Sequence, residues 1–471
     1  MKAFIVYATY DNIDNETVVQ LFGRLENEQS FAAINKVQPY FFIRKKDLSH
    51  LSKTEKFEET KIKKFLQSPR AEGRDVGLLD AQDATKSNKH LDMKNFQGEE
   101  VVKLSFKNQT LLNEAYKKFY KKIEIYEGDI KPQYRFIIDN NLLGCIEIEG
   151  DYENSEKIDR IYKEPKISPS NFKPELKVVS IDTESDKKTG KLFCIGIYGK
   201  NYKKNFMITS RELKNTISCK TETECLEKFK SELLKLDPDI ITGWNVIDFD
   251  FVYLKDLFRK NKIKFDLGRT NNEASLRIEK NFFRSSKMDI PGRQVLDGLN
   301  LIRDPFLKEA PSIKHAKFES FSLEDISQEI LKDGKLIIGK NRHEEIEKLY
   351  KEQSEKSLQK LVEYNLQDCK LVFDILEKIE VIDLAIERSK LTGLPLDRLT
   401  ASIAAFDSLY IREAHTKCLV SPSLNFKEKE ARIKGGYVQS SKPGVYRNVL
   451  VLDFKSLYPS IIKTFNIDPA S

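Results

Sequence analysis

Two acidic residues separated by one position, Asp182 and Glu184, follow directly on the apolar stretch from Leu176 to Ile181. That stretch predicts a β-strand, and side chains two positions apart on a strand point to the same face. At about 4 Å and an effective dielectric constant near 20, two like charges repel by roughly 4 kcal/mol, and a divalent cation removes this cost. The pair alone is a weak indication, because Asp151-Tyr152-Glu153 repeats the pattern beside a glycine, where a charged turn is the simpler interpretation.

Further residues of the same chemistry occur where later elements are expected to begin or to close the fold. Asn245 and Asp250 belong to a segment that ends one strand and opens a helix. Tyr364 and Asp368 lie four positions apart on a long helical stretch and therefore share a face. Four carboxylates can hold two Mg²⁺ or Mn²⁺ ions, one activating a water and the other stabilising a leaving oxygen, with Tyr364 orienting the water. The four are Asp182, Glu184, Asp250 and Asp368. The alternative is a chance set of surface acids and helix caps, and Asp250 is the member most open to it.

The order of the elements around these residues predicts a mixed α/β fold. Three strands are followed by a helix, a strand and a second helix, which is the order of a ribonuclease-H-like sheet. A long helix then closes the region. The expected strands are 176–181, 192–198, 205–209 and 239–243, and the expected helices are 221–235, one from Asp250, and 355–379.

The length of 471 residues predicts two or three domains. Residues 1–165 are expected to form a mixed N-terminal domain with strands at 3–9, 17–25 and 40–43. Three prolines between residues 163 and 174 indicate a linker. The ribonuclease-H-like domain is expected over 166–390, and a Gly/Pro break separates it from 391–471, which begins with a helix over 400–415.

Composition narrows the class of protein. With 40% hydrophobic and 32% charged residues, and no long uncharged apolar run, the chain is expected to be cytoplasmic and not to enter a membrane. The six cysteines form no C-x-x-C pair and the five histidines are scattered, which argues against zinc. The net charge of +7 permits a nucleic-acid partner without demanding one.

A second motif lies near residue 453, where an apolar run leads into Leu452-Asp453-Phe454-Lys455-Ser456-Leu457-Tyr458-Pro459. This string resembles motif A of family B DNA polymerases, of the bacterial DNA polymerase II type or its archaeal counterparts. The D-x-E at Asp182, the N-x-x-x-F-D ending at Asp250 and the Y-x-x-x-D ending at Asp368 resemble the exonuclease motifs of that family in order. The resemblance implies an N-terminal domain, a ribonuclease-H-like 3′–5′ proofreading exonuclease domain and the start of a palm. DNA is then the expected partner, and a nucleoid-associated location is expected with it.

The resemblance also implies roles for individual residues. Asp453 would bind the polymerase metals together with the carbonyl of Phe454, and Tyr458 would exclude a 2′-hydroxyl. The remaining implied contacts are those of Ser456 and Leu457 with a deoxynucleoside triphosphate, and those of Asn245, Phe249, Gly435, Gly436 and Tyr437 with DNA.

Eighteen residues follow Asp453, and they supply no fingers helix, second palm carboxylate or thumb. The expectation is therefore an active exonuclease that adds no nucleotides alone and needs a second polypeptide or a continuation of the chain. Residues 445–452 are expected to be a palm strand whose bare edge pairs with that partner or aggregates. Two alternatives remain: a non-catalytic DNA-binding or assembly subunit derived from a polymerase, and a free-standing ribonuclease-H-like nuclease.

Overall fold

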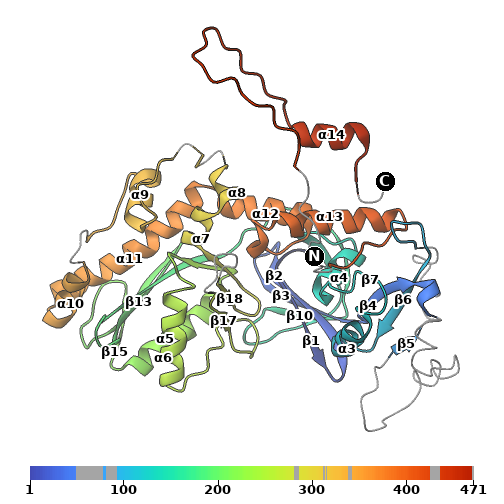
Figure 1. Ribbon diagram of the computed structural model, residues 1–471. Helices are drawn as coiled ribbons and strands as arrows, with labels where there is room; N and C mark the ends of the chain where they lie inside the picture. Colours follow the sequence, from blue (N-terminus) through green and yellow to red (C-terminus); the bar gives the residue numbers. More distant parts are fainter. Residues whose placement is uncertain are drawn as a thin grey trace. The chain divides into compact units, whose positions relative to one another are not determined.

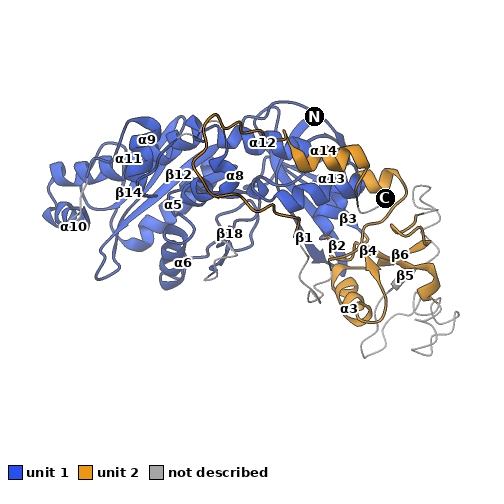
Figure 2. Cartoon of the chain, turned by 45° about the horizontal axis from the view of Figure 1, so that its top comes forward, with its two compact units in different colours: residues 1–37, 131–412 blue, residues 38–130, 413–471 orange. Residues whose placement is uncertain are grey.

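The chain forms two compact units in a computed structural model that describes residues 1–48, 78–80, 93–279, 286–310, 313–314, 316–337, 342–424 and 435–468 (Figure 1). The first unit comprises residues 1–37 and 131–412, and the second comprises residues 38–130 and 413–471 (Figure 2). Compactness of this kind does not test the predicted domain boundaries near residues 165 and 390, which stay a prediction.

A seven-stranded sheet of unit 1 contains the N-terminal residues. The expected strands at 3–9 and 17–25 are confirmed, and the turn between them places Asp14 and Asn15 at positive φ, as a tight hairpin requires. The linker interpretation is wrong for Lys166–Pro169, which pairs as an edge strand, where a terminal proline is tolerated. The strands, in sheet order, are β11 (Lys166–Pro169), β8 (Cys145–Glu149), β1 (Lys2–Ile13), β2 (Glu16–Leu25), β3 (Ser30–Val37), β10 (Arg160–Lys163) and β9 (Tyr152–Glu153), and the helix α4 (Pro132–Asp139) packs against β1 and β2.

The second sheet of unit 1 has the order β15-β14-β13-β12-β16-β19. Its first three strands in the chain form an antiparallel meander, and β16 and β19 then add parallel to β12. This arrangement confirms the ribonuclease-H-like mixed sheet. The strands are β12 (Val178–Ser185), β13 (Leu192–Gly199), β14 (Tyr202–Ile208), β15 (Thr216–Cys219), β16 (Ile240–Gly243) and β19 (Gln294–Asp297).

Helices cover both faces of this sheet (Figure 1). The long helix α11 (Glu355–Lys378) packs on β12, β13 and β14, and α5 (Glu222–Leu236) and α6 (Asp250–Lys260) lie on the other face. Ser354 caps α11 by accepting a hydrogen bond from the amide of Ser357. The remaining elements of unit 1 are β17 (Ser275–Arg277), β18 (Lys287–Asp289), α7 (Gly298–Arg303), α8 (Pro305–Lys308), α9 (Leu323–Leu331), α10 (Arg342–Glu352), α12 (Val381–Thr392) and a 3₁₀ turn at Leu396–Arg398.

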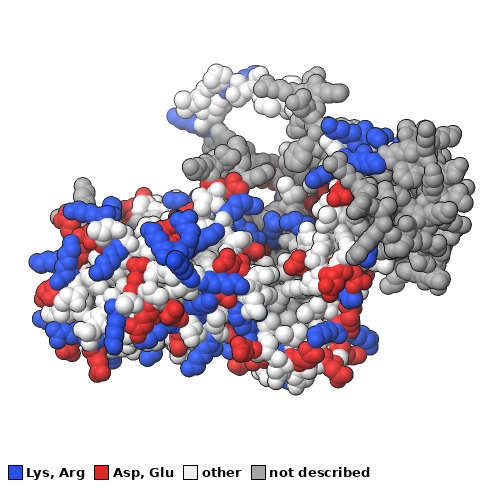
Figure 3. Space-filling model, turned by 90° about the horizontal axis from the view of Figure 1, so that it is seen from below, with Lys and Arg blue, Asp and Glu red and all other residues white. Residues whose placement is uncertain are grey.

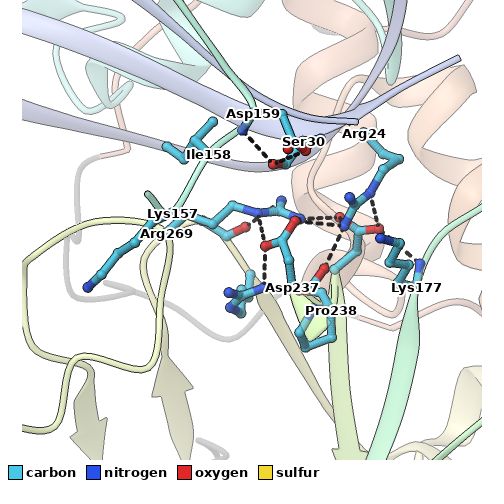
Figure 4. A network of polar contacts seen from close by, with 12 residues as sticks. Arg24, Ser30, Lys157, Ile158, Asp159, Lys177, Asp237, Pro238 and Arg269 are labelled. Atoms are coloured by element: carbon cyan, nitrogen blue, oxygen red, sulfur yellow. Dashed lines mark hydrogen bonds and ion pairs between the residues drawn. The ribbon is translucent and has the colours of Figure 1, made fainter. Parts of the chain in front are cut away.

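A buried ion network joins the two sheets of unit 1 (Figure 4). Asp239, which is fully buried before β16, accepts hydrogen bonds from Arg24 of β2 and from Arg269. It also accepts from the amide of Lys177 at 2.9 Å, just before β12. The second acid of the network, Asp237, binds the same two arginines and Arg293. The network therefore fixes the starts of β12 and β16 to the N-terminal sheet.

Unit 2 contains a four-stranded sheet of order β5-β6-β4-β7. The strand expected at 40–43 is confirmed as β4 (Tyr40–Arg44), and Phe41 and Ile43 pack with α3 (Gln109–Phe119). The other strands are β5 (Leu78–Asp80), β6 (Val101–Phe106) and β7 (Ile125–Tyr126), with a 3₁₀ turn at Lys45–Asp47. Helix α13 (Ser402–Thr416), expected over 400–415, crosses the division between the units, and α14 (Leu457–Phe465) lies in unit 2.

Residues 445–452 were expected to form a palm strand, and they do not. They are exposed and have no regular secondary structure, and no backbone among the described residues pairs with them. A strand is stable only when its amides and carbonyls find partners.

The surface charges are mixed in sign. On the described part of the face in Figure 3, acidic and basic side chains alternate without a large field of one sign. None of the described helices combines the length and the apolar composition that crossing a membrane requires.

Candidate active site

Three acidic side chains meet where α11 crosses β12. Asp182 and Glu184 lie within β12, which is longer than the sequence suggested, and Asp368 lies on α11. One carboxylate oxygen from each lies within 4.8 Å of the other two. The strand period of two and the helix covering that face bring these residues together. The structure thus brings together three of the four predicted carboxylates.

The chemistry of this cluster fits a hard divalent cation. Its donors are all carboxylate oxygens, which Mg²⁺ and Mn²⁺ prefer. The Oδ1 atom of Asp368 is buried and has no hydrogen-bond partner among the described residues. A buried acceptor left in this way is a ready ligand for a cation.

Asp250 occupies a different position from the other three carboxylates. It is the first residue of α6 and is 2% exposed. Its Oδ1 accepts hydrogen bonds from the amide and the hydroxyl of Thr183, at 2.9 and 2.7 Å. Because Thr183 alternates with Asp182 and Glu184 along β12, its side chain points to the α6 face of the sheet. Asp250 is therefore held beside the cluster rather than within it.

Burial makes ionisation of these acids unfavourable. Desolvation, with the neighbouring Asp368, raises the pKa of Glu184 to about 8. Desolvation also raises the pKa of Asp250 to about 7, although Thr183 opposes the shift. The pKa of Asp182 lies well above its usual value because of burial and the nearby Glu184 and Asp250. Burial therefore favours the protonated forms of Asp182, Glu184 and Asp250.

Tyr364 and Lys335 complete the polar surroundings of Asp368. Tyr364 is 1% exposed, and burial raises the pKa of its hydroxyl, so the phenol stays protonated. The Lys335 ammonium contacts Asp368 Oδ2 and lies 3.5 Å from the Tyr364 hydroxyl. This ammonium places a positive charge beside Asp368.

The cluster opens into a groove of about 1150 Å³ in unit 1. Asn245, held at a φ of +60°, and Phe249, which is 56% exposed, both line this groove, as their assignment to a binding role requires. Basic and apolar side chains share the walls, among them Lys187, Lys255, Arg259, Arg342, Val252 and Ile278.

The predicted residues of the C-terminal region form no comparable site. Among the residues that the structure describes, Asp453 belongs to no cluster of three or more acidic, histidine or cysteine side chains that could hold a metal ion. Phe454, Tyr458 and Tyr437 are exposed, and so are the other predicted residues there: Asp453, Ser456, Leu457, Gly435 and Gly436. Their roles stay predictions.

Sequence reasoning missed three residues: Lys335 and Asn365, which contact carboxylates of the cluster, and Asn205, which contacts Asn365. Asn365 follows Tyr364 directly, so its place in the Y-x-x-x-D motif was a signal. Lys335 and Asn205 carried none, because their contacts depend on how distant segments pack.

The raised pKa values predict how stability depends on pH. The pKa of Glu184 rises from its ordinary 4.5 to about 8 on folding, so the folded protein binds more protons than the unfolded chain between these values. This contribution to stability is present below the ordinary pKa and is lost as the pH rises through about 8.

A divalent cation can neutralise the carboxylates in place of the protons. We expect Mg²⁺ to raise the melting temperature more at about pH 8.5 than at about pH 5.5, relative to a chelator. An equal effect at both values, or an unchanged response in Glu184→Gln, would contradict this.

Two family descriptions match the chain. The description of the DNA polymerase family B exonuclease domain matches residues 123–315, a range that contains Asp182, Glu184 and Asp250 but ends before Tyr364 and Asp368. The description of DNA polymerase family B matches residues 400–470, which contain Asp453.

Individual DNA polymerases are also similar to the chain. DNA polymerase II of Escherichia coli is 36% identical over 74% of this chain and 43% of its own length. A DNA polymerase of Thermococcus gorgonarius is 24% identical over 99% of this chain and 54% of its own length. The family B DNA polymerase of Pyrobaculum calidifontis shares the fold, with a TM-score of 0.70 at 18% identity over 100% of this chain and 57% of that structure. The chain thus spans about half the length of the curated relatives it matches.

Proposed function

Because the chain belongs to the family B DNA polymerases and carries their metal-dependent exonuclease domain, we propose that it removes nucleotides from the 3′ end of DNA. The observation that carries the proposal is the cluster of Asp182, Glu184 and Asp368 at the floor of an open groove. Proofreading of a polymerase product is the role that fits this activity.

In this proposal the four carboxylates hold two Mg²⁺ or Mn²⁺ ions. When bound, these ions lower the pKa of a water and stabilise the leaving 3′ oxygen. The Tyr364 hydroxyl, kept protonated by burial, orients the attacking water. Thr183 holds Asp250 beside the cluster.

The groove would receive the single-stranded 3′ end. Exposed Phe249 offers a face on which a base can stack, and Asn245 offers an amide to the terminal nucleotide. Lys187, Lys255 and Arg259 line the same groove and would contact phosphates.

The region around Asp453 would contribute to nucleotide addition. Asp453 and the Phe454 carbonyl would bind the polymerase metals, Ser456, Leu457 and Tyr458 would bind a deoxynucleoside triphosphate, and Gly435, Gly436 and Tyr437 would contact the template. Addition also requires a second palm carboxylate, fingers and a thumb, from whichever polypeptide carries them. We place the protein in the cytoplasm with the nucleoid, in replication or repair.

The test uses a 5′-labelled DNA strand whose terminal linkages are blocked by phosphorothioates at either the 3′ or the 5′ end. We expect the purified protein to shorten the strand stepwise with Mg²⁺ or Mn²⁺, to stop in chelator, and to stop on the 3′-blocked strand only. If both blocked strands are degraded alike, or if neither ion supports degradation, the proposal fails.

A further inference from the structure

A row of three residues crosses the sheet beneath α11. Asp182 of β12 lies opposite Gly196 of β13, which lies opposite Asn205 of β14. Residues directly opposite each other on neighbouring strands point to the same face. The row therefore leads from a cluster carboxylate, across a position without a side chain, to a buried amide.

The missing side chain of Gly196 makes room for Asn365 of α11. A Cβ atom at Gly196 would lie 2.3 Å from Asn365 Oδ1 and 2.9 Å from Cys369 Sγ. Neither distance is tolerable between non-bonded atoms, so glycine is required here for space.

Asn365 bridges the two ends of the row. Its Oδ1 accepts a hydrogen bond from Asn205 Nδ2 at 2.7 Å, and its Nδ2 donates to Asp182 Oδ2 at 2.7 Å. The same Nδ2 donates to the Asp182 carbonyl at 3.3 Å. Both asparagines are fully buried. These two contacts set the direction of the Asn365 amide. A reversed amide would turn its oxygen toward the Asp182 carboxylate and its NH₂ group toward the NH₂ group of Asn205.

From these contacts we propose that Asn365, held by Asn205 in the space above Gly196, is a positioning residue for Asp182. It holds one oxygen of the Asp182 carboxylate, which leaves the other oxygen for a divalent cation shared with Glu184 and Asp368. Residues that orient metal ligands in this way typically change metal affinity or activity by about 10- to 100-fold when they are replaced.

The inference rests on the proposed function, and its test measures metal binding as well as activity. Mn²⁺ binding to the full chain is followed by the electron paramagnetic resonance of free Mn²⁺, and kcat and KM are measured on single-stranded DNA. In Asn365→Ala we expect Mn²⁺ affinity and kcat to fall by about 10- to 100-fold, with KM for DNA unchanged and kcat partly restored at high Mn²⁺. Asn205→Ala should lower Mn²⁺ affinity and kcat by a smaller factor. The double variant should have the same Mn²⁺ affinity and kcat as Asn365→Ala, because Asn205 acts through Asn365.

A matched control separates positioning from general destabilisation. Asn95 is also fully buried and hydrogen-bonded, but it lies in unit 2, bonded to Tyr126 and Glu99. Asn95→Ala should lower the melting temperature without changing Mn²⁺ affinity. If Asn365→Ala fails to fold, Asn205→Ala, which touches none of the cluster carboxylates, decides by the same two measurements.

The possible failures are distinguishable. Mn²⁺ affinity that is lost in Asp182→Ala and unchanged in Asn365→Ala and Asn205→Ala overturns the positioning role alone. Wild-type Mn²⁺ affinity and DNA degradation in Asp182→Ala overturn the proposed function. Loss of kcat in Asn365→Ala with unchanged Mn²⁺ affinity also refutes the inference, because it assigns the residue a different role.

Discussion

Replacing Asp182 and Glu184 together by alanine is expected to abolish degradation of DNA 3′ ends and to leave the protein folded. The two residues supply two of the three carboxylates whose oxygens lie within 4.8 Å of one another. Asp368 and the neighbouring Asp250, which remain, cannot by themselves hold the ions that a two-metal hydrolysis requires. The fold should tolerate the change, because burial and mutual repulsion already disfavour the ionised pair. Activity is measured on single-stranded DNA with Mg²⁺ and with Mn²⁺, and folding by circular dichroism and thermal melting.

The chain provides its own control for this experiment. Asp151 and Glu153 repeat the D-x-E pattern around the short edge strand β9, where both are exposed and Glu153 pairs with Lys163. Alanine at both positions should leave the rate of degradation unchanged. Wild-type degradation by the Asp182→Ala, Glu184→Ala protein would show that the cluster is not the active site. An equal loss in the control would point to an indirect effect.

The parts of this site that could be predicted are those set by local periodicity. The alternation of β12 places Asp182 beside Glu184, and the helical period of α11 places Tyr364 beside Asp368. The three strands of the meander and the later strand β16 could be predicted from the order of apolar stretches along the chain, whereas β19 was not predicted. These patterns involve residues only a few positions apart, so a single sequence is enough to predict the strands and helices that they form.

The parts that could not be predicted depend on contacts between distant segments. The hydrogen bonds of Asn365 require a glycine on β13 beneath α11. The contact of Lys335 with Asp368 requires the segment that follows α9 to fold back onto α11. The prediction of a palm strand at 445–452 was wrong for the same reason. Whether a segment forms a strand depends on a neighbouring strand to pair with as well as on its own β-propensity. The sequence predicted that Asp250 begins a helix, but it did not predict the hydrogen bonds that Asp250 accepts from Thr183.

Replacing Asp239 by alanine is expected to lower the free energy of unfolding by about 3–5 kcal/mol, the cost of removing one partner from a buried ion pair. Although burial opposes its ionisation, Arg269 and Arg24 hold the pKa of Asp239 below its usual value, so its charge is present at neutral pH. Its removal leaves two fully buried arginines with one fewer anion, and it leaves the amide of Lys177 without its 2.9 Å acceptor. Urea denaturation followed by fluorescence measures the change.

The comparison that decides this prediction is a salt bridge on the surface of the same unit. Glu149 pairs with Lys166 at 2.9 Å, with its side chain 57% exposed. Glu149→Ala should leave the free energy of unfolding nearly unchanged, because water screens the pair. Asp239→Ala also acts on function, since the network holds Lys177, which lies directly before β12 and five residues before Asp182. We therefore expect its DNA degradation to be lost at a lower temperature than in Glu149→Ala. If the two variants unfold at the same urea concentration, the network does not stabilise the junction of the two sheets.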